Sequence, residues 1–316
     1  MATTLTNMID EVSMNLSGYT LTQDRSTYLR TAVTTTTSSS ASPTTLSLGS
    51  TDNVGKGIVE IDEELLWIDT YDRVGNTATV APYGRGYLGT TAATHAADAK
   101  VTISPTFPRF TIKRAINDTI NAIGSSIFAA STTTITSNAA VAAFRLPATG
   151  TTLNIRNILS IAYESIGASK EWVPIRSWRF DSNANSTAFT SGQTISIYDV
   201  VPSGRTIQVV YAKDPTSFSE LATLALTNAQ EFTTVTGLPD SCKDLVILGA
   251  TYRLLSNLDP ARASMVSPQA DEVDNKRPYG SSQSLTKQVY ALYSQRLAEE
   301  VRSQQDKYPI RVHYSL

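Results

Sequence analysis

The chain contains two histidines, and neither has partners at the spacing that metal or catalytic sites use. His95 lies in a polar stretch that predicts a loop, and His313 lies near the end of the sequence. No cysteine or second histidine stands beside either of them at ligand spacing. The pattern therefore predicts neither a metal site nor a histidine-dependent catalytic centre, and we expect no cofactor.

A run of acidic residues offers a second kind of chemistry, the binding of a calcium ion. Asp62, Glu63 and Glu64 are followed by Asp69 and Asp72. Their spacing differs from that of an EF-hand loop, and the glycine at the centre of such a loop is missing. The run therefore favours an acidic turn between two strands, exposed to water.

Glycines around Arg85 offer a third candidate, a loop that could cradle phosphate. Gly84 and Gly86 flank the arginine, and Gly89 follows. The stretch lacks the lysine and the following helix of a P-loop, and it lies between predicted strands. These glycines therefore indicate unusual backbone angles or close packing. With no Gly-x-Ser-x-Gly element and no nucleophile–base pair, the sequence predicts a protein that is not an enzyme.

The single cysteine, Cys242, excludes an intramolecular disulfide and fits a reducing compartment. It stands at the start of a predicted helix, where the pKa of a thiol can be lowered. A small buried residue is the favoured interpretation, because free cysteine is among the residue types most often buried.

Composition limits the function further. The chain has 316 residues, of which 41% are hydrophobic and 17% charged, with a net charge of −2. The length predicts two or three domains, and the absence of a basic excess argues against nucleic-acid binding by general electrostatics. Met1 to Asp10 has no secretory pattern, and no stretch approaches the roughly 20 apolar residues of a membrane span.

Apolar residues recur at helical spacing in four segments and predict four amphipathic helices. We expect Gly18 to end the first, Gly124 to end the second, and Pro239 to lie in the first turn of the third. On the fourth, Glu299, Glu300, Arg302 and Gln304 are expected to cover the face in water. The predicted apolar faces are Leu5, Met8, Ile9, Val12 and Leu16; Ile112, Ile116, Thr119, Ile120 and Ile123; Leu245, Leu248, Tyr252 and Leu255; and Val289, Tyr293 and Leu297, widened by Leu285, Leu292 and Val301.

Short β-prone runs separated by turns fill the two regions between these helices, as in small barrels and sandwiches. The first region has runs at 31–33, 45–48, 58–61, 65–69, 77–81 and 100–103, and the second at 153–155, 158–163, 172–175, 178–180, 194–198 and 206–211.

The sequence thus predicts an α+β multidomain protein, a helical bundle built from both ends of the chain with two inserted β domains. The bundle comprises 1–30, 106–129 and 237–307. Residues 31–105 form a small barrel-like domain, 130–236 a β-sandwich, and 308–316 a C-terminal arm. In the arm, Ile310, Val312 and Tyr314 alternate with polar residues, which predicts a strand without an obvious partner in its own chain. The loop 257–284 is long enough to be functional or disordered.

One segment resembles a known family. Ile61 to Ile68 is followed by Arg85-Gly86-Tyr87-Leu88-Gly89-Thr90-Thr91-Ala92-Ala93-Thr94-His95, then by Val101 to Pro105, Phe107 to Phe110 and the second helix. This Arg-Gly-Tyr-x-Gly-Thr-x-Ala-x-x-His pattern is similar to virion proteins of tailed bacteriophages. The order of helix, β insertion, helix, sandwich and helix pair resembles head-to-tail connector (adaptor) proteins.

The resemblance implies a structural role. Such proteins form a ring, typically of twelve copies, beneath the portal protein in the neck of the virion. They extend the channel through which double-stranded DNA passes, and they dock the next neck or tail protein. The resemblance also implies that the arm grips the portal, through Tyr308, Ile310, Val312, Tyr314 and Leu316. We expect synthesis in the host cytoplasm and no membrane association.

Two alternatives remain open. The chain could be a tail-fibre, baseplate or receptor-binding component whose sandwich binds carbohydrate through Trp172, Trp178 and Tyr198. Aromatic residues on a β face are more often part of a core than a sugar platform. The second alternative is an enzyme such as a virion hydrolase, which the missing acid–base pair disfavours.

Overall fold

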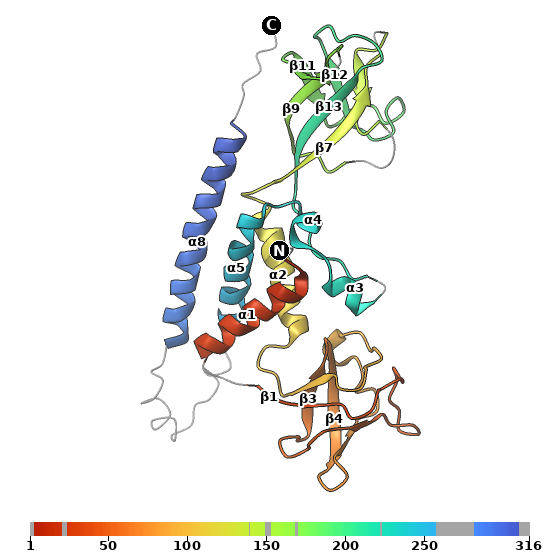
Figure 1. Ribbon diagram of the computed structural model, residues 1–316, viewed down its shortest axis with the longest axis vertical. Coiled ribbons are helices and arrows are strands. Elements are labelled where there is room, and N and C mark those ends of the chain that lie inside the picture. The colour runs from red at the N-terminus through yellow and green to blue at the C-terminus, as the bar shows by residue number, and fades with distance from the viewer. Residues whose placement is uncertain are drawn as a thin grey trace. The chain divides into compact units, whose positions relative to one another are not determined.

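The computed structural model describes residues 3–20, 24–138, 140–148, 153–167, 170–221, 223–256 and 281–309 (Figure 1). Within these ranges the chain is a mixed α+β protein with six helices and three antiparallel sheets. The helices are α1 (Leu5–Thr20), α2 (Arg109–Ile123), α3 (Leu224–Asn228), α4 (Phe232–Thr236), α5 (Lys243–Ser256) and α8 (Ser281–Lys307). Two short 3₁₀ helices are η1 (Tyr87–Gly89) and η2 (Asp240–Cys242).

The first β region forms one six-stranded sheet that curves into a half-barrel, here called the six-stranded module. Its order is β1-β6-β3-β4-β5-β2. Backbone bonds from Arg30 N–H to the Ser47 carbonyl and from Gly49 N–H to the Tyr28 carbonyl join the ends of the two outer strands. The strands are β1 (Arg25–Tyr28), β2 (Thr45–Ser47), β3 (Gly57–Ile61), β4 (Glu64–Asp72), β5 (Thr77–Val80) and β6 (Lys100–Ile103).

The second β region forms two sheets that share one apolar core, here called the two-sheet module. The sheet orders are β10-β9-β13-β7 and β11-β12-β8. Ile161, Ile207 and Val209 from the larger sheet and Ile195 from the smaller one belong to the same buried cluster. The strands are β7 (Ala129–Thr136), β8 (Ala143–Arg145), β9 (Asn157–Glu164), β10 (Trp172–Pro174), β11 (Trp178–Asp181), β12 (Thr194–Ile197) and β13 (Thr206–Lys213).

The predicted apolar faces of α1 and α2 are confirmed, since all ten residues named for them are buried. The predicted stop at Gly18 is wrong, because Gly18 does not adopt a positive φ and α1 continues to Thr20. Among the predicted strands, 31–33 contributes only one isolated bridge, between Val33 and His95. The segment 153–155 is not a strand, because β9, which pairs with β13, begins only at Asn157.

The predicted apolar faces of α5 and α8 differ in part from the faces that are buried. On α5, Leu245 and Leu255 are buried as predicted, but Leu248 and Tyr252 are only half-buried, while Val246, Ile247, Ala250 and Leu254 are buried. This helix is therefore covered on more than one side. On α8, Val289, Tyr293 and Glu300 are buried and Leu292 is exposed. Because 289, 293 and 300 follow one face at helical spacing, Glu300 occupies an inward position rather than the predicted one in water.

The chain divides into two compact units. Unit 1 comprises 1–4, 118–246 and 293–316, and it contains the two-sheet module. Unit 2 comprises 5–117 and 247–292, and it contains the six-stranded module. The predicted assignment of barrel, sandwich, bundle and arm boundaries stays a prediction. None of the helices in the described ranges is long and apolar enough to cross a bilayer.

Candidate functional site: a buried carboxylate, arginine and histidine clasp

The turn between β3 and β4, with the strand ends beside it, places four carboxylates within five residues. The strands pair up to Ile61 and Glu64, so Asp62 and Glu63 form the turn itself. Asp62 adopts a left-handed φ of 58°, a conformation that Asp tolerates better than most residues. Glu60, Glu63 and Glu64 are buried. We call residues 60–64 the acidic turn.

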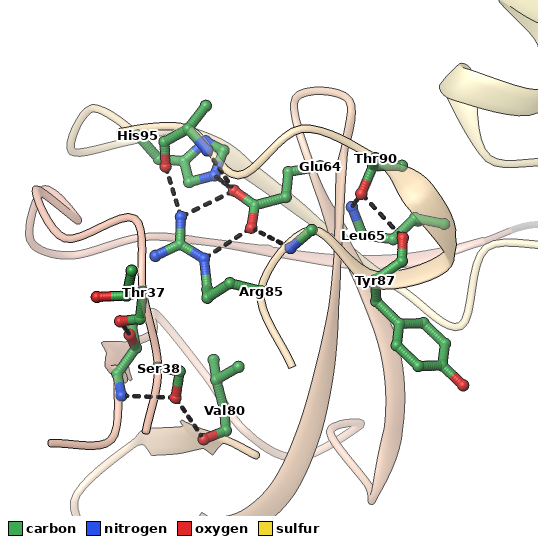
Figure 2. A network of polar contacts seen from close by, with 12 residues as sticks. Thr37, Ser38, Glu64, Leu65, Val80, Arg85, Tyr87, Thr90 and His95 are labelled. Atoms are coloured by element: carbon green, nitrogen blue, oxygen red, sulfur yellow. Dashed lines mark hydrogen bonds and ion pairs between the residues drawn. The ribbon is translucent and has the colours of Figure 1, made fainter. Parts of the chain in front are cut away.

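Glu64 lies at the centre of the site and accepts five hydrogen bonds (Figure 2). Oε1 accepts from Arg85 Nε at 2.7 Å and from the Gly86 N–H at 2.9 Å. Oε2 accepts from Arg85 Nη2 at 2.8 Å, from the Ala93 N–H at 2.9 Å and from His95 Nε2 at 2.8 Å. The guanidinium therefore binds the carboxylate in a bidentate manner, the strongest geometry for this pair.

Arg85 also binds the backbone of two irregular segments. Its guanidinium donates to the carbonyl oxygens of Thr35 and Ala93. The side chains of Arg85 and Glu64 are only 2% and 1% exposed. A buried charge is costly unless it is paired and hydrogen-bonded, and Arg85 and Glu64 meet both conditions. The pair thereby fixes segments that carry few ladder hydrogen bonds of their own.

His95 completes the site by bridging two carboxylates. Its Nδ1 lies 2.7 Å from Asp62 and its Nε2 lies 2.8 Å from Glu64. Only a doubly protonated imidazole donates from both nitrogens. Burial lowers the pKa of His95, but the hydrogen bonds to Asp62 and Glu64 outweigh it, so the pKa is raised above its usual value. We refer to Asp62, Glu64, Arg85 and His95 as the clasp.

The clasp keeps Glu64 ionised. Burial alone would raise the pKa of Glu64, but the hydrogen bonds from Arg85 and His95, with those from Ala93 and Gly86, lower it to about 2. A carboxylate that accepts five donors has no free lone pair with which to act as a base. Because both His95 nitrogens are also engaged, the clasp is built to hold loops in place rather than to move protons.

The other two carboxylates of the acidic turn bind helix α2. Glu63 Oε2 lies 2.6 Å from Lys113 Nζ, and both side chains are buried. Glu60 accepts the Arg109 N–H at the first residue of α2 at 2.6 Å. Burial, opposed by this hydrogen bond, raises the pKa of Glu60 to about 7. Arg109 in turn pairs with Asp10 of α1 at 2.6 Å.

The structure overturns one prediction and confirms another. The prediction that the acidic turn is exposed to water is wrong for Glu63 and Glu64, because both are buried with cationic partners. The interpretation of the glycines is confirmed. A Cβ on Gly84 would lie 2.9 Å from the carbonyl oxygens of Ala81 and Trp67, and Gly86 adopts a φ of 60°. Within the described ranges, no three His, Cys, Asp or Glu side chains are arranged to hold a metal ion.

Other residues singled out from the sequence lie apart from the clasp. Cys242 is fully buried, and burial with the nearby Glu300 carboxylate raises the pKa of its thiol to about 12. The expectation that this pKa could be lowered is therefore wrong, and the interpretation of Cys242 as a small buried residue is confirmed. Trp172 and Tyr198 are exposed, whereas Trp178 packs against the core of the two-sheet module.

Of the predicted portal-binding residues, only Tyr308 is described. Its ring lies 5.7 Å from that of Phe128. Ile310, Val312, Tyr314 and Leu316, and His313 among them, lie outside the described residues. The long loop at 257–284 also lies outside them, except for its last four residues, where α8 begins.

The pairing of the clasp is not periodic, so sequence reasoning missed it. Arg85 and His95 lie 21 and 31 residues after Glu64, in a stretch without a regular repeat. The available signal was the number of charges: between Ala81 and Ala97 only Arg85 and His95 are basic, and an acidic turn precedes them.

Comparison with known proteins gives the chain its family. None of the curated proteins compared with this chain matches it. The family model described as SU10 adaptor protein matches residues 88–312, which is more than half of the chain and includes His95. On this match, the chain belongs to the SU10 adaptor protein family.

Proposed function

We propose that the protein is a head-to-tail adaptor that assembles as a ring, typically of twelve copies, beneath the portal in the neck of a phage virion. The ring extends the DNA channel and docks the next neck or tail protein. The observation that carries this proposal is the family match over residues 88–312, which indicates a structural adaptor protein and a component of the virion. Such a role implies association with other virion proteins and requires no catalysis.

The net charge of −2 supports the part of the proposal that concerns DNA. DNA must move through a neck without being held. A channel rich in Lys and Arg would bind it by releasing counterions, and each phosphate contact would strengthen that binding. A nearly neutral, slightly acidic protein suits transient passage.

The base of the C-terminal arm supports a role for the arm in portal binding. Gln304 on α8 satisfies both backbone groups of Phe128: its Nε2 donates to the Phe128 carbonyl at 2.6 Å, and its Oε1 accepts the Phe128 N–H at 3.1 Å. The Tyr308 ring then packs against the Phe128 ring. An arm that begins at a fixed point loses less conformational entropy on binding. We propose that Tyr308, Ile310, Val312, Tyr314 and Leu316 contact the portal by adding a strand to it.

Truncation after Pro309 tests this assignment, because it keeps the Tyr308–Phe128 contact. Native mass spectrometry would compare the full and truncated chains with and without the virion's portal protein. We expect the full chain to form a closed ring on the portal, and the truncated chain to stay folded but lose portal binding. Undiminished portal binding by the truncated chain would refute the role of the arm, whereas a stable trimer without portal affinity would refute the adaptor itself.

Two exposed aromatic rings favour a second candidate function, a receptor-binding module that binds carbohydrate. Trp172 is the first residue of β10, Tyr198 follows β12, and both are exposed. Exposed aromatic rings can stack on sugar rings, whereas Trp178 is committed to the core. A glycan array probed with the full chain and with Trp172→Ala tests this function, with Val200→Ala, at a more exposed apolar residue, as the control. Glycan binding that is lost only in Trp172→Ala would favour it.

A further inference from the structure

Strand β7 lies at the edge of its sheet and carries none of the usual protection of an edge strand. Among the described residues it pairs only with β13, in a register without a bulge. Its eight residues, Ala129–Thr136, include no charged residue and no proline. Natural sheets protect their edges with charges, proline or bulges, because unpaired N–H and C=O groups attract other strands. The free edge of β7 therefore calls for a segment that covers it.

The even-numbered residues of β7 form this free edge. Ser137, the residue after the strand, donates its N–H to the Arg205 carbonyl at 2.7 Å, next to β13. Backbone groups along a strand alternate in direction, so the odd-numbered residues of β7 face β13 and the even-numbered ones face away from it. The side chains of Thr132, Thr134 and Thr136 are exposed, so the free edge is accessible.

Helix α8 already occupies the position at which this edge begins. Phe128 comes directly before β7, is also even-numbered, and has both backbone groups bound by the side-chain amide of Gln304. That amide offers an N–H donor and a C=O acceptor, as the backbone of a neighbouring strand would. The Tyr308 ring, one turn further along, lies 5.7 Å from the Phe128 ring. The chain therefore leaves α8 where the free edge of β7 starts.

The residues that follow α8 match this edge in reach and in pattern. Residues 310–316 lie outside the described residues, and their reach as a strand is about 23 Å, against about 26 Å for β7. Along β7 the buried Ala129 and Ile135 are odd-numbered and the exposed threonines even-numbered. The arm has the same alternation of apolar and polar residues, in Ile310-Arg311-Val312-His313-Tyr314-Ser315. As a strand beside β7, it would continue both the apolar and the polar face of the sheet.

We propose that residues 310–316 bind the free edge of β7 in the same chain, as an added parallel strand. The two segments run in the same direction because both start from the contact at Phe128. The occupant is the chain's own arm, because it is tethered beside the edge. A tethered segment meets its site at an effective concentration in the millimolar range, which a separate copy or another protein in dilute solution does not reach.

This contact would hold the arm back until the portal is present. The portal contact proposed above uses the same residues, so the arm must leave β7 to reach the portal. This consequence rests on the proposed adaptor function. The strand addition to β7 concerns the free chain and does not.

Amide hydrogen exchange of the free chain, resolved by residue with NMR, tests the strand addition. The full chain is compared with the chain truncated after Pro309. We expect the amides of residues 130, 132, 134 and 136 to exchange at least about tenfold faster in the truncated chain. The amides of residues 131, 133 and 135 face β13 in both chains and are the matched control. Equal exchange of the even-numbered amides in the two chains would overturn the proposal.

An engineered disulfide distinguishes the chain's own arm from the arm of a second copy. His313→Cys is combined with Thr132→Cys or with Thr134→Cys, because adjacent strands lie about 4.8 Å apart, within the reach of a disulfide. The control combines His313→Cys with Arg179→Cys, at an exposed residue of the edge strand β11. The native Cys242 is fully buried and does not compete.

We expect one of the two β7 pairs to give a monomer with an internal disulfide, at a yield at least about tenfold above that of the control. Disulfide-linked dimers as the main product would assign the edge to a second copy and overturn the proposal. A yield equal to that of the control would overturn it as well.

The same disulfide tests whether the arm is held back from the portal. We expect the oxidised chain to bind the virion's portal protein at least about tenfold more weakly than the same chain after reduction, with the unmodified chain as the control under both conditions. Equal portal binding by the oxidised and reduced forms would overturn this consequence. An unmodified chain that does not bind the portal would refute the adaptor function instead, and the exchange and disulfide results on the free chain would stand.

Discussion

The two β modules bury very different side chains. The six-stranded module buries Glu60, Glu63, Glu64, Arg85 and His95, all of which can carry charge. In the described part of the two-sheet module, the buried polar residues are Ser137, Ser191, Gln193 and Thr194, none of which does. The difference follows from the backbone. Strand β13 pairs over eight residues with β7 and also pairs with β9, so its backbone groups are satisfied by the ladder.

The six-stranded module instead contains irregular segments, at 33–38 and 81–95, that make few ladder bonds. Buried backbone groups need partners, and here the clasp supplies them through Glu64 and Arg85. The burial of Glu64, Arg85 and His95 therefore coincides with the need to fix loops. The segment 81–95 gains a defined conformation. In return, the stability of the six-stranded module depends on the ion pairs of the clasp and on pH.

The largest expected effect is the loss of the clasp. Arg85→Met keeps an apolar stem but leaves the Glu64 carboxylate buried with a missing partner, so we expect a loss of about 3–5 kcal/mol. Urea unfolding followed by Trp67 fluorescence reports the six-stranded module alone when Trp172 and Trp178 are replaced by Phe. Arg73→Met in the β4–β5 turn of the same module is the control, because Arg73 is exposed. A loss below about 1 kcal/mol for Arg85→Met would show that Glu64 finds other partners.

The next effect concerns Glu60 and alkaline pH. The pKa of Glu60 is raised from 4.5 to about 7, so the folded state holds the proton more tightly than the unfolded state. Its contribution to stability is complete below pH 4.5 and is lost as pH rises through 7. Glu60→Gln still accepts from the Arg109 N–H but does not titrate. We expect Glu60→Gln to raise the free energy of unfolding above that of the wild type at pH 8.5, by roughly 2–3 kcal/mol more than at pH 4.5. The same Trp67 assay measures this difference. Parallel pH profiles for both proteins would contradict this.

His95 and Glu64 give the module opposite responses to pH. The pKa of His95 is raised, so its contribution is complete below pH 6.5 and is lost as pH rises through its folded pKa. The pKa of Glu64 is lowered to about 2, so its contribution is complete above pH 4.5 and is lost as pH falls toward 2. Together they stabilise the module most between pH 4.5 and 6.5. His95→Gln should reduce the loss of stability at alkaline pH and keep the loss at acid pH. The two-sheet module, residues 129–213, contains no histidine and should show no such alkaline loss.

Periodicity predicted much of the fold and little of the site. The inward faces of α1 and α2 and most strands follow from spacings of 3.6 and 2, which are local properties of the chain. The inward position of Glu300 was missed because charge usually indicates exposure. In the structure Arg296 lies 2.7 Å from Glu300, and Ser241 donates to it at 3.0 Å. The clasp was missed for a related reason. Glu64, Arg85 and His95 are brought together by strand pairing and loop closure, which leave no repeat in the sequence.

The smallest expected effect tests whether burial or distance decides the strength of an ion pair. Lys56 and Asp69 lie 2.6 Å apart, as close as Arg85 and Glu64 at 2.7 Å. Their side chains are 64% and 43% exposed, however, against 2% and 1% in the clasp. Water and salt screen the exposed pair, so Lys56→Met should cost only about 0–0.5 kcal/mol, with little change at high salt. The same substitution type at Arg85 removes a partner that water cannot replace. Equal losses at the two positions would mean that the clasp is hydrated in solution, and the contrast between the two β modules would then rest on their backbone ladders alone.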